Sequence, residues 1–167
     1  MTSKLLIRGA IALAFATSLA SHAAPPPDTT TMTIQASVPG VCRVQNAGVL
    51  DFGEVDNQQG NDTDMAATFE WRCTKGTTGT ITIDDGGNGN RTMTSALTAT
   101  PLAYDLYMDP SRTLRWGGAP TEAIIVSGSG MNTPVARSVY GRVEAPDAEA
   151  ADPANNYQDA VTLSVTW

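Results

Sequence analysis

Polar and apolar residues alternate one by one in several short segments of this chain. The alternation is cleanest near the C-terminus, where Val161, Leu163, Val165 and Trp167 are separated from one another by single hydroxyl residues. A period of two places every second side chain on the same face of a β-strand. The segment therefore predicts a strand with one buried and one exposed face, and its period does not fit an amphipathic helix.

Six further segments show the same alternation or a short apolar run, and each predicts a strand. They are residues 32–38, 69–73, 81–83, 102–108, 124–126 and 139–143. Clusters of Gly, Asn, Asp and Pro at 84–90, 117–120 and 128–130 favour turns. The segment nearest to a helix, 145–154, contains Pro146 and Pro153, so we predict no helix there. Many short strands joined by turns predict an all-β sandwich.

The first 23 residues are predicted to be a secretory signal peptide. Lys4 and Arg8 precede an apolar run from Gly9 to Leu19, and Ser21-His22-Ala23 offers small residues for cleavage. A membrane anchor is the alternative, but the run is shorter than the roughly 20 residues that a spanning helix needs. No later stretch is apolar enough to span a bilayer. We therefore expect a secreted chain with a flexible, Pro- and Thr-rich extension at 24–31 and one domain at 32–167.

Cleavage would change the charge and remove the single histidine of the chain. Eight of the ten basic residues would remain against 17 acidic ones, which gives a net charge of −9. Such an acidic chain disfavours nucleic acid and anionic membrane surfaces as partners. Without histidine, neither a Ser-His-Asp nor a Cys-His arrangement can form. We predict no enzymatic activity and no catalytic residues.

Two pairs of carboxylates lie close together in the sequence, Glu54 with Asp56 and Asp84 with Asp85. Both pairs are in turn-like sequence, where acidic side chains usually cap the backbone or face solvent. The Asp84–Asn90 loop also lacks the ligand pattern and terminal glutamate of an EF-hand. These residues favour turns over a catalytic or calcium site.

Cys42 and Cys73 are the only cysteines. An even pair in an exported protein usually forms a disulfide. Two thiols without histidine make a poor zinc site. We expect a disulfide, no metal and no cofactor.

Several fragments, taken in order, resemble the spore coat protein U domain family, whose members include subunits of archaic (Csu-type) chaperone–usher pili. The resemblance runs from Thr33 to Trp167, and the chain departs from it at Asn155-Asn156, where members often carry a glycine. The fragments are Cys42, Leu50-Asp51-Phe52-Gly53, Cys73, Leu102-Ala103-Tyr104-Asp105-Leu106-Tyr107, Trp116-Gly117, Val139-Tyr140-Gly141-Arg142 and Tyr157-Gln158-Asp159.

The resemblance implies an incomplete immunoglobulin-like β-sandwich that is completed by donor-strand exchange. Its groove would lie beside the C-terminal strand, with Val161, Leu163, Val165 and Trp167 facing first a periplasmic chaperone and then a neighbouring subunit. An outer-membrane usher would export the growing fibre to the cell surface. The candidate donor residues are Met32, Ile34, Ala36 and Val38. The same segment could instead be the first strand of its own domain, and both alternatives stay open.

The leading functional hypothesis is a structural pilus subunit that contributes to surface adhesion and biofilm formation. A spore or cell coat protein with the same fold is the first alternative. A carbohydrate-binding module is the second, with Trp116 and Tyr140 as stacking residues, although a packed loop anchor is the favoured interpretation of Trp116. An extracellular hydrolase is disfavoured by the missing histidine. Trp71 and Trp167 are expected in the core.

Overall fold

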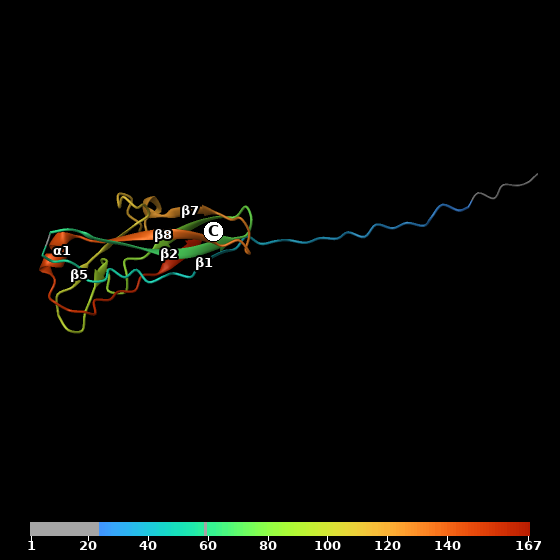
Figure 1. Cartoon of the computed structure of the whole chain (residues 1–167). Helices are drawn as coiled ribbons and strands as arrows, with labels where there is room; N and C mark the ends of the chain where they lie inside the picture. The colour runs from blue at the N-terminus through green and yellow to red at the C-terminus, as the bar shows by residue number, and fades with distance from the viewer. Residues whose placement is uncertain (1–23, 59) are drawn as a thin grey trace, which may run out of the picture. The chain divides into compact units, whose positions relative to one another are not determined.

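The computed structural model describes residues 24–58 and 60–167 (Figure 1). The predicted signal peptide, residues 1–23, lies outside the described residues. Residues 37–167 form one compact unit, and the described residues before Ser37 belong to a separate unit without regular secondary structure. In the described residues, no helix has the length and apolar character needed to cross a membrane.

Short strands dominate the compact unit. They are β1 (Cys42–Gln45), β2 (Thr63–Cys73), β3 (Thr78–Ile83), β4 (Thr92–Met93), β5 (Leu102–Ala103), β6 (Asp105–Tyr107), β7 (Ile124–Ser127), β8 (Val135–Val143) and β9 (Leu163–Thr166). A 3-10 turn, η1 (Pro120–Glu122), and one short helix, α1 (Ala145–Ala150), complete the described elements.

The strands form two antiparallel sheets and a small ribbon. The first sheet has the order β1-β2-β8-β6 and the second has the order β7-β3-β9, while β4 pairs with β5. The longest pairing, between β2 and β8, runs from Thr63 opposite Val143 to Trp71 opposite Val135. Alternate residues of both sheets meet in one apolar core. The predicted all-β fold class is confirmed.

Trp116 is a central part of this core, as the interpretation of a packed loop anchor predicts. Its side chain is fully buried, its ring lies 5.1 Å from that of Phe69, and its Nε1–H donates to the carbonyl of Ile81 at 3.2 Å. A buried indole cannot stack on a sugar. Trp71 is buried as well.

Downstream of β1, three local predictions from the sequence are wrong. Residues 145–150 do form a helix, because Pro146 occupies the first turn, where the missing N–H removes no hydrogen bond. Residues 102–108 divide into β5 and β6, which pair with different strands. Trp167 is 60% exposed, since it lies past the end of β9, and its Nε1–H donates to the carbonyl of Gly40 at 2.9 Å.

The segment 32–38 is not a strand in the structure, although its alternation predicts one. Met32 and Ile34 are 83% and 87% exposed. The first strand of the domain is β1, which begins after Pro39 and Gly40. A strand needs a paired neighbour for its backbone groups, and alternation alone does not supply one.

The predicted disulfide joins Cys42 to Cys73 and is confirmed. The two residues lie opposite each other in the β1–β2 register, and both are buried. The bond therefore fastens the edge strand β1 to the centre of the first sheet.

Replacing both cysteines, Cys42→Ala with Cys73→Ala, should lower the free energy of unfolding by about 3–4 kcal/mol, because the bond closes a loop of 31 positions in the unfolded chain. Urea unfolding measures this loss. Reductant should destabilise the wild type by a similar amount and leave the double variant unchanged. Equal midpoints for the oxidised and reduced wild type would contradict the prediction.

Candidate functional site

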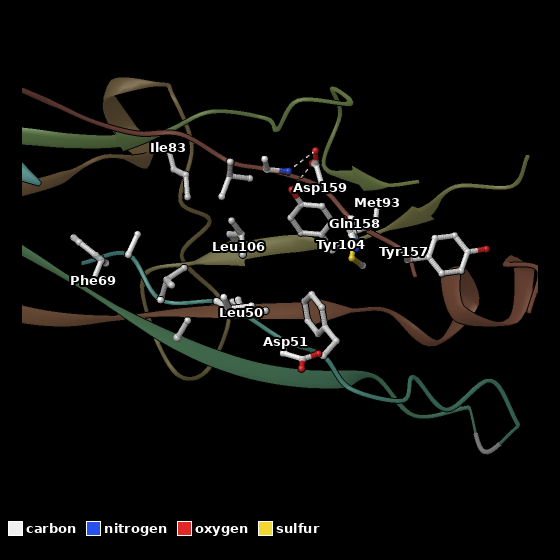
Figure 2. Close-up of a pocket in the computed structure, with 18 of the residues that line it drawn as sticks. Leu50, Asp51, Phe69, Ile83, Met93, Tyr104, Leu106, Tyr157, Gln158 and Asp159 are labelled. Carbon is white, nitrogen blue, oxygen red and sulfur yellow. Dashed lines mark hydrogen bonds between the residues drawn. The ribbon is translucent and has the colours of Figure 1, made fainter. Parts of the chain in front are cut away.

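A groove of about 580 Å³ opens between two extended segments of the compact unit (Figure 2). One wall is formed by residues 47–52, which follow β1, and the other by residues 155–163, which lead into β9. Since β1 and β9 are edge strands of different sheets, the groove lies where one further strand would join the two sheets. Side chains lining its apolar part include Leu50, Phe52, Phe69, Ile83, Leu106, Val139, Val161 and Leu163.

The wall leading into β9 has hydrogen bonds on one side only. Asp84 N–H donates to the carbonyl of Thr162 at 3.1 Å, and Gly87 N–H donates to that of Ala160 at 2.9 Å. Backbone groups of successive residues in an extended strand point to opposite sides. Asp159 and Val161 therefore direct theirs toward the groove, and within the described residues neither makes a backbone–backbone hydrogen bond.

The opposite wall follows the same rule. Gly48 N–H donates to the carbonyl of Thr68 in β2 at 2.8 Å, whereas Ala47 and Val49 make no backbone–backbone hydrogen bond in the part of the chain that the structure describes. Position 48 has little room for a side chain, because a Cβ there would lie 3.2 Å from the carbonyl oxygen of Thr68. Two rows of unpaired backbone groups thus border the groove, and one extended strand could pair with both.

The side chains that face the groove are only partly covered. Leu50, Val161 and Leu163 pack against the core but remain half-buried. Apolar surface left open to water is what an inserted side chain would bury, at about 25 cal/mol per Å². The groove therefore offers a strand both hydrogen bonds and hydrophobic contact.

Asp159 anchors the middle of the wall that leads into β9, between Tyr157 and Leu163 (Figure 2). Its carboxylate accepts hydrogen bonds from the Tyr104 hydroxyl at 2.7 Å and from the backbone N–H and side-chain amide of Asn88, both at 3.1 Å. Burial, together with this hydrogen bond to Asp159, raises the pKa of Tyr104 above its usual value of 10.0. The adjoining Gln158 exchanges two backbone hydrogen bonds with Thr94. These contacts fix where the wall runs.

Matches with known proteins agree with this architecture. Residues 28–164 match the Spore Coat Protein U domain. The chain belongs to this family. A relative, Protein U of Myxococcus xanthus, is 29% identical over an alignment of 156 positions, which covers 83% of this chain and 84% of the relative. The resemblance predicted from the sequence is therefore confirmed.

A solved structure shows the same fold as this spore coat protein U domain. It is the CsuC–CsuE chaperone–tip adhesion subunit pre-assembly complex from archaic chaperone–usher Csu pili of Acinetobacter baumannii. The likeness has a TM-score of 0.52 and 22% identity, and it covers 78% of this chain. The chain spans only 40% of the length of that protein. The comparison supports the immunoglobulin-like sandwich that the sequence predicts.

Only two of the four predicted acceptor residues of the spore coat protein U domain line the groove. Val161 and Leu163 line the groove, Val165 packs against the core, and Trp167 lies beyond both. Of the predicted donor residues, Met32, Ile34 and Ala36 precede the compact unit, and Val38 lies at its N-terminal boundary.

The wall at 47–52 and the Tyr104–Asp159 contact were not predicted as parts of the site. The sequence around the wall, Ala47-Gly48-Val49-Leu50, has no alternation that would reveal it. The fragments Leu50-Asp51-Phe52-Gly53 and Tyr157-Gln158-Asp159, which carry the resemblance, were the only signal.

Three of the four carboxylates in the two predicted pairs, Asp56, Asp84 and Asp85, have structural partners. Asp84 accepts hydrogen bonds from Gly86 N–H at 3.0 Å and Thr162 N–H at 2.9 Å. Although burial acts in the opposite direction, these bonds lower the pKa of Asp84. Asp56 accepts from Gln58 N–H at 2.8 Å, as turn residues do. Within the described residues, no group of three or more His, Cys, Asp or Glu side chains could hold a metal ion.

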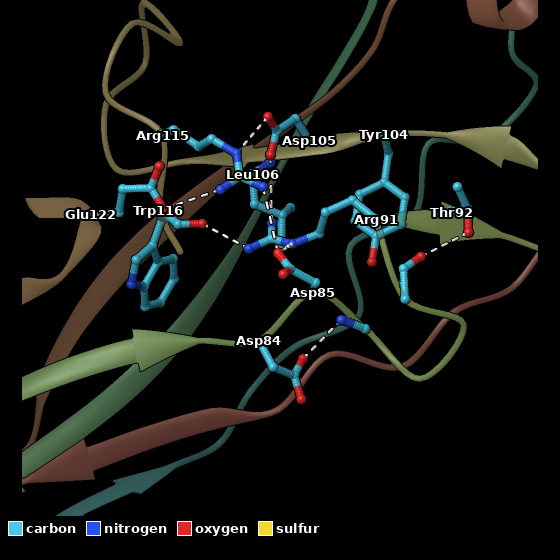
Figure 3. Close-up of polar contacts among 12 residues, drawn as sticks. Asp84, Asp85, Arg91, Thr92, Tyr104, Asp105, Leu106, Arg115, Trp116 and Glu122 are labelled. Atoms are coloured by element: carbon cyan, nitrogen blue, oxygen red, sulfur yellow. Dashed lines mark hydrogen bonds and ion pairs between the residues drawn. The ribbon is translucent and has the colours of Figure 1, made fainter. Parts of the chain in front are cut away.

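Arg91 joins the loop that follows β3 to the core (Figure 3). Its guanidinium is buried, donates to the carbonyl of Trp116 at 2.7 Å, and lies 3.5 Å from Asp85 and 3.7 Å from Asp105. Asp85 also lies 3.5 Å from Arg115. Asp85 therefore forms ion pairs with Arg91 and Arg115 that support the loop beside the groove. It does not form a free carboxylate pair with Asp84.

Gly86→Ala should destabilise the domain much more than Gly89→Ala. Both glycines have positive φ, +84° and +73°, but a Cβ at Gly86 would lie 1.9 Å from Asp159 Oδ2, whereas a Cβ at Gly89 meets nothing within 4 Å. We expect a loss of about 1 kcal/mol for Gly89→Ala and about 3 kcal/mol for Gly86→Ala. Urea unfolding compares the two variants, and equal losses would show that Asp159 is not the obstacle.

Tyr104 should make the domain less stable at alkaline pH. Because its pKa is raised in the folded state, its stabilising contribution is complete below about pH 10 and is lost as the pH rises above that value. Tyr104→Phe should flatten the fall in unfolding free energy between pH 8 and 11. Tyr107, whose pKa burial also raises, accounts for a remaining slope. Identical pH profiles for the variant and the wild type would contradict this assignment.

Proposed function

We propose that this spore coat protein U domain is a structural subunit of a secreted chaperone–usher type fibre and that its groove accepts a β-strand from a neighbouring subunit. The observation that carries the proposal is the pair of unpaired backbone rows at 47–49 and 159–161, on either side of an apolar floor. The family membership and the fold shared with a Csu pilus protein support it.

An inserted strand would remove two energetic penalties at once. It would pair the exposed N–H and C=O groups of both walls, and it would cover the half-buried side chains of Leu50, Val161 and Leu163. An open edge beside apolar surface otherwise invites aggregation. This physical need is the reason for proposing a periplasmic chaperone that fills the groove before assembly and an outer-membrane usher that exports the subunit.

The donor that we propose is the segment 32–38 of another copy of this chain. Four apolar residues, Met32, Ile34, Ala36 and Val38, would face the groove, and the polar residues between them would face outward. Seven residues of strand extend about 23 Å. The wall from Tyr157 to Leu163 also has seven residues, so donor and acceptor match in length.

A fibre of such subunits would lie at the cell surface, where we propose that it contributes to adhesion and biofilm formation. A coat protein with the same groove is the second candidate, because the matched family is described as a spore coat domain. The sugar-binding alternative has no support in the geometry, since Trp116 is buried and the Tyr140 ring lies under the Arg112 guanidinium at 5.8 Å. We propose a structural and not a catalytic role.

A synthetic peptide of residues 29–38 should stabilise the purified protein. At about 100 times its Kd, we expect the Tm to rise by about 5–10 °C. A peptide carrying Ile34→Asp should give no rise, because it would place a charge on the apolar floor. The matched peptide carrying Gln35→Asp should retain the effect, because position 35 faces outward.

Differential scanning fluorimetry and size-exclusion chromatography provide the readouts. The chain without peptide should form polymers or aggregates, and the peptide should convert it to monomers. A stable monomer whose Tm responds to none of the peptides would rule out strand insertion and leave the coat-protein alternative.

A further inference from the structure

The two ends of the β-sandwich carry unpaired charge that is mainly of opposite sign. Glu70 in β2 is an exception near the disulfide, and its carboxylate accepts hydrogen bonds from Gln45 at 3.3 Å and Asn46 at 2.8 Å. Near the disulfide, Arg43 lies opposite Arg72 in the β1–β2 register, and Lys75 is in the turn that follows β2. With Arg137 in β8, these residues make no ion pair within the described part of the chain. The remaining described basic residues, all held by carboxylates, are Arg91, Arg112, Arg115 and Arg142. We call the surface of Arg43, Arg72 and Lys75 the basic end.

The opposite end, where β2 begins and β8 ends, is acidic. Figure 1 shows α1 at this end, away from the C-terminus. Arg142 lies here too, but Asp64 at 2.8 Å and Asp62 at 3.3 Å neutralise it. The acidic residues at this end that form no ion pair with any described residue are Glu54, Glu144, Asp147, Glu149 and Asp152. We call the surface of Glu54, Glu144 and Glu149 the acidic end.

The proposed donor segment, residues 32–38, is connected to the basic end of the domain without a linker. Val41 N–H donates to Thr74 Oγ1 at 3.2 Å, Thr74 N–H donates back to the carbonyl of Val41 at 2.8 Å, and Trp167 holds the carbonyl of Gly40. Val38 is 82% exposed. Only Pro39 therefore separates the last proposed donor residue from the first anchored residue.

This attachment restricts how copies can follow one another. Consider a donor copy whose segment is inserted in the groove of an acceptor copy. If the segment left the groove at the acceptor's basic end, the donor's domain would occupy the place where the acceptor's own donor segment departs, and the contact could not repeat. Departure at the acidic end gives a head-to-tail contact that repeats without limit. From Val38 to Gly40 the chain spans at most about 7 Å, which is less than the Debye length of about 8 Å at physiological ionic strength.

We propose that the basic end of one copy docks on the acidic end of the next copy and forms a second contact beside the inserted strand. This inference rests on the proposed function, because strand insertion brings the two ends together. Paired charges at the junction steer the incoming copy and accelerate its addition. The partner is a second copy of this chain, recognised by charge complementarity.

Charge reversal at each end tests the contact. The variants are R43E/K75E at the basic end, E54K/E149K at the acidic end, and the combination of all four substitutions. At low ionic strength, the elongation rate measured by light scattering should fall about tenfold in each double variant. The combined variant should return to within about twofold of the wild type, because the charges again oppose each other.

Net charge alone predicts a different result. It predicts slower elongation for R43E/K75E, which makes the chain more acidic, but faster elongation for E54K/E149K, which brings the net charge closer to zero. Slower elongation of both double variants, with recovery in the combination, supports the contact. Unchanged elongation, or acceleration by E54K/E149K, overturns it.

Binding of the 29–38 peptide to each variant separates this inference from the proposed function. The peptide should bind all four proteins with equal affinity, because none of the substituted residues lines the groove. Loss of peptide binding in the wild type would reject strand insertion itself. Normal peptide binding with elongation rates insensitive to the charge reversals would reject only the end-to-end contact.

Discussion

Backbone groups without partners at two sheet edges are the constraint on which the rest of the structure depends. β1 and β9 each have a neighbour on one side only, and the walls that continue them present free N–H and C=O groups toward the same groove. Unpaired edges of this kind are normally blocked by charges, bulges or covering loops. Here an apolar floor lies between them, which makes the gap attractive to a further strand.

The remainder of the domain holds these two edges in place. The Cys42–Cys73 bond fastens β1 to β2, and Trp116 fills the space between the sheets with its indole N–H satisfied. Midway along the groove, Tyr104 and Asn88 hold Asp159 and with it the wall that leads to β9. A gap between rigid walls loses little conformational entropy when a strand enters, which favours binding.

The sequence predicts elements far better than pairings. Alternation identified β2, β3, β8 and β9, because half-buried strands require it, and a short apolar run identified β7. The cysteine pair predicted the disulfide. The pattern could not distinguish a strand paired in its own domain from residues 32–38, where the same alternation is present without a partner. A proline at the first turn concealed α1, and the wall at 47–52 shows no period at all. The groove depends on which edges remain unpaired, and that property belongs to the topology and not to any single segment.

The unpaired positive charge and the point where the proposed donor segment leaves the domain lie at the same end. Carboxylates pair with four of the described basic residues, Arg91, Arg112, Arg115 and Arg142. The described basic residues without an ion pair, Arg43, Arg72, Lys75 and Arg137, lie in the half of the domain that contains the disulfide. The proposed donor segment, residues 32–38, departs from that same half, and hydrogen bonds fix Gly40 and Val41 to the folded domain. A flexible linker would let neighbouring copies rotate freely and would make the charge at their ends irrelevant. Its absence brings the ends within the distance over which charges act, so the same short connection that delivers the strand also gives the charge asymmetry a physical effect.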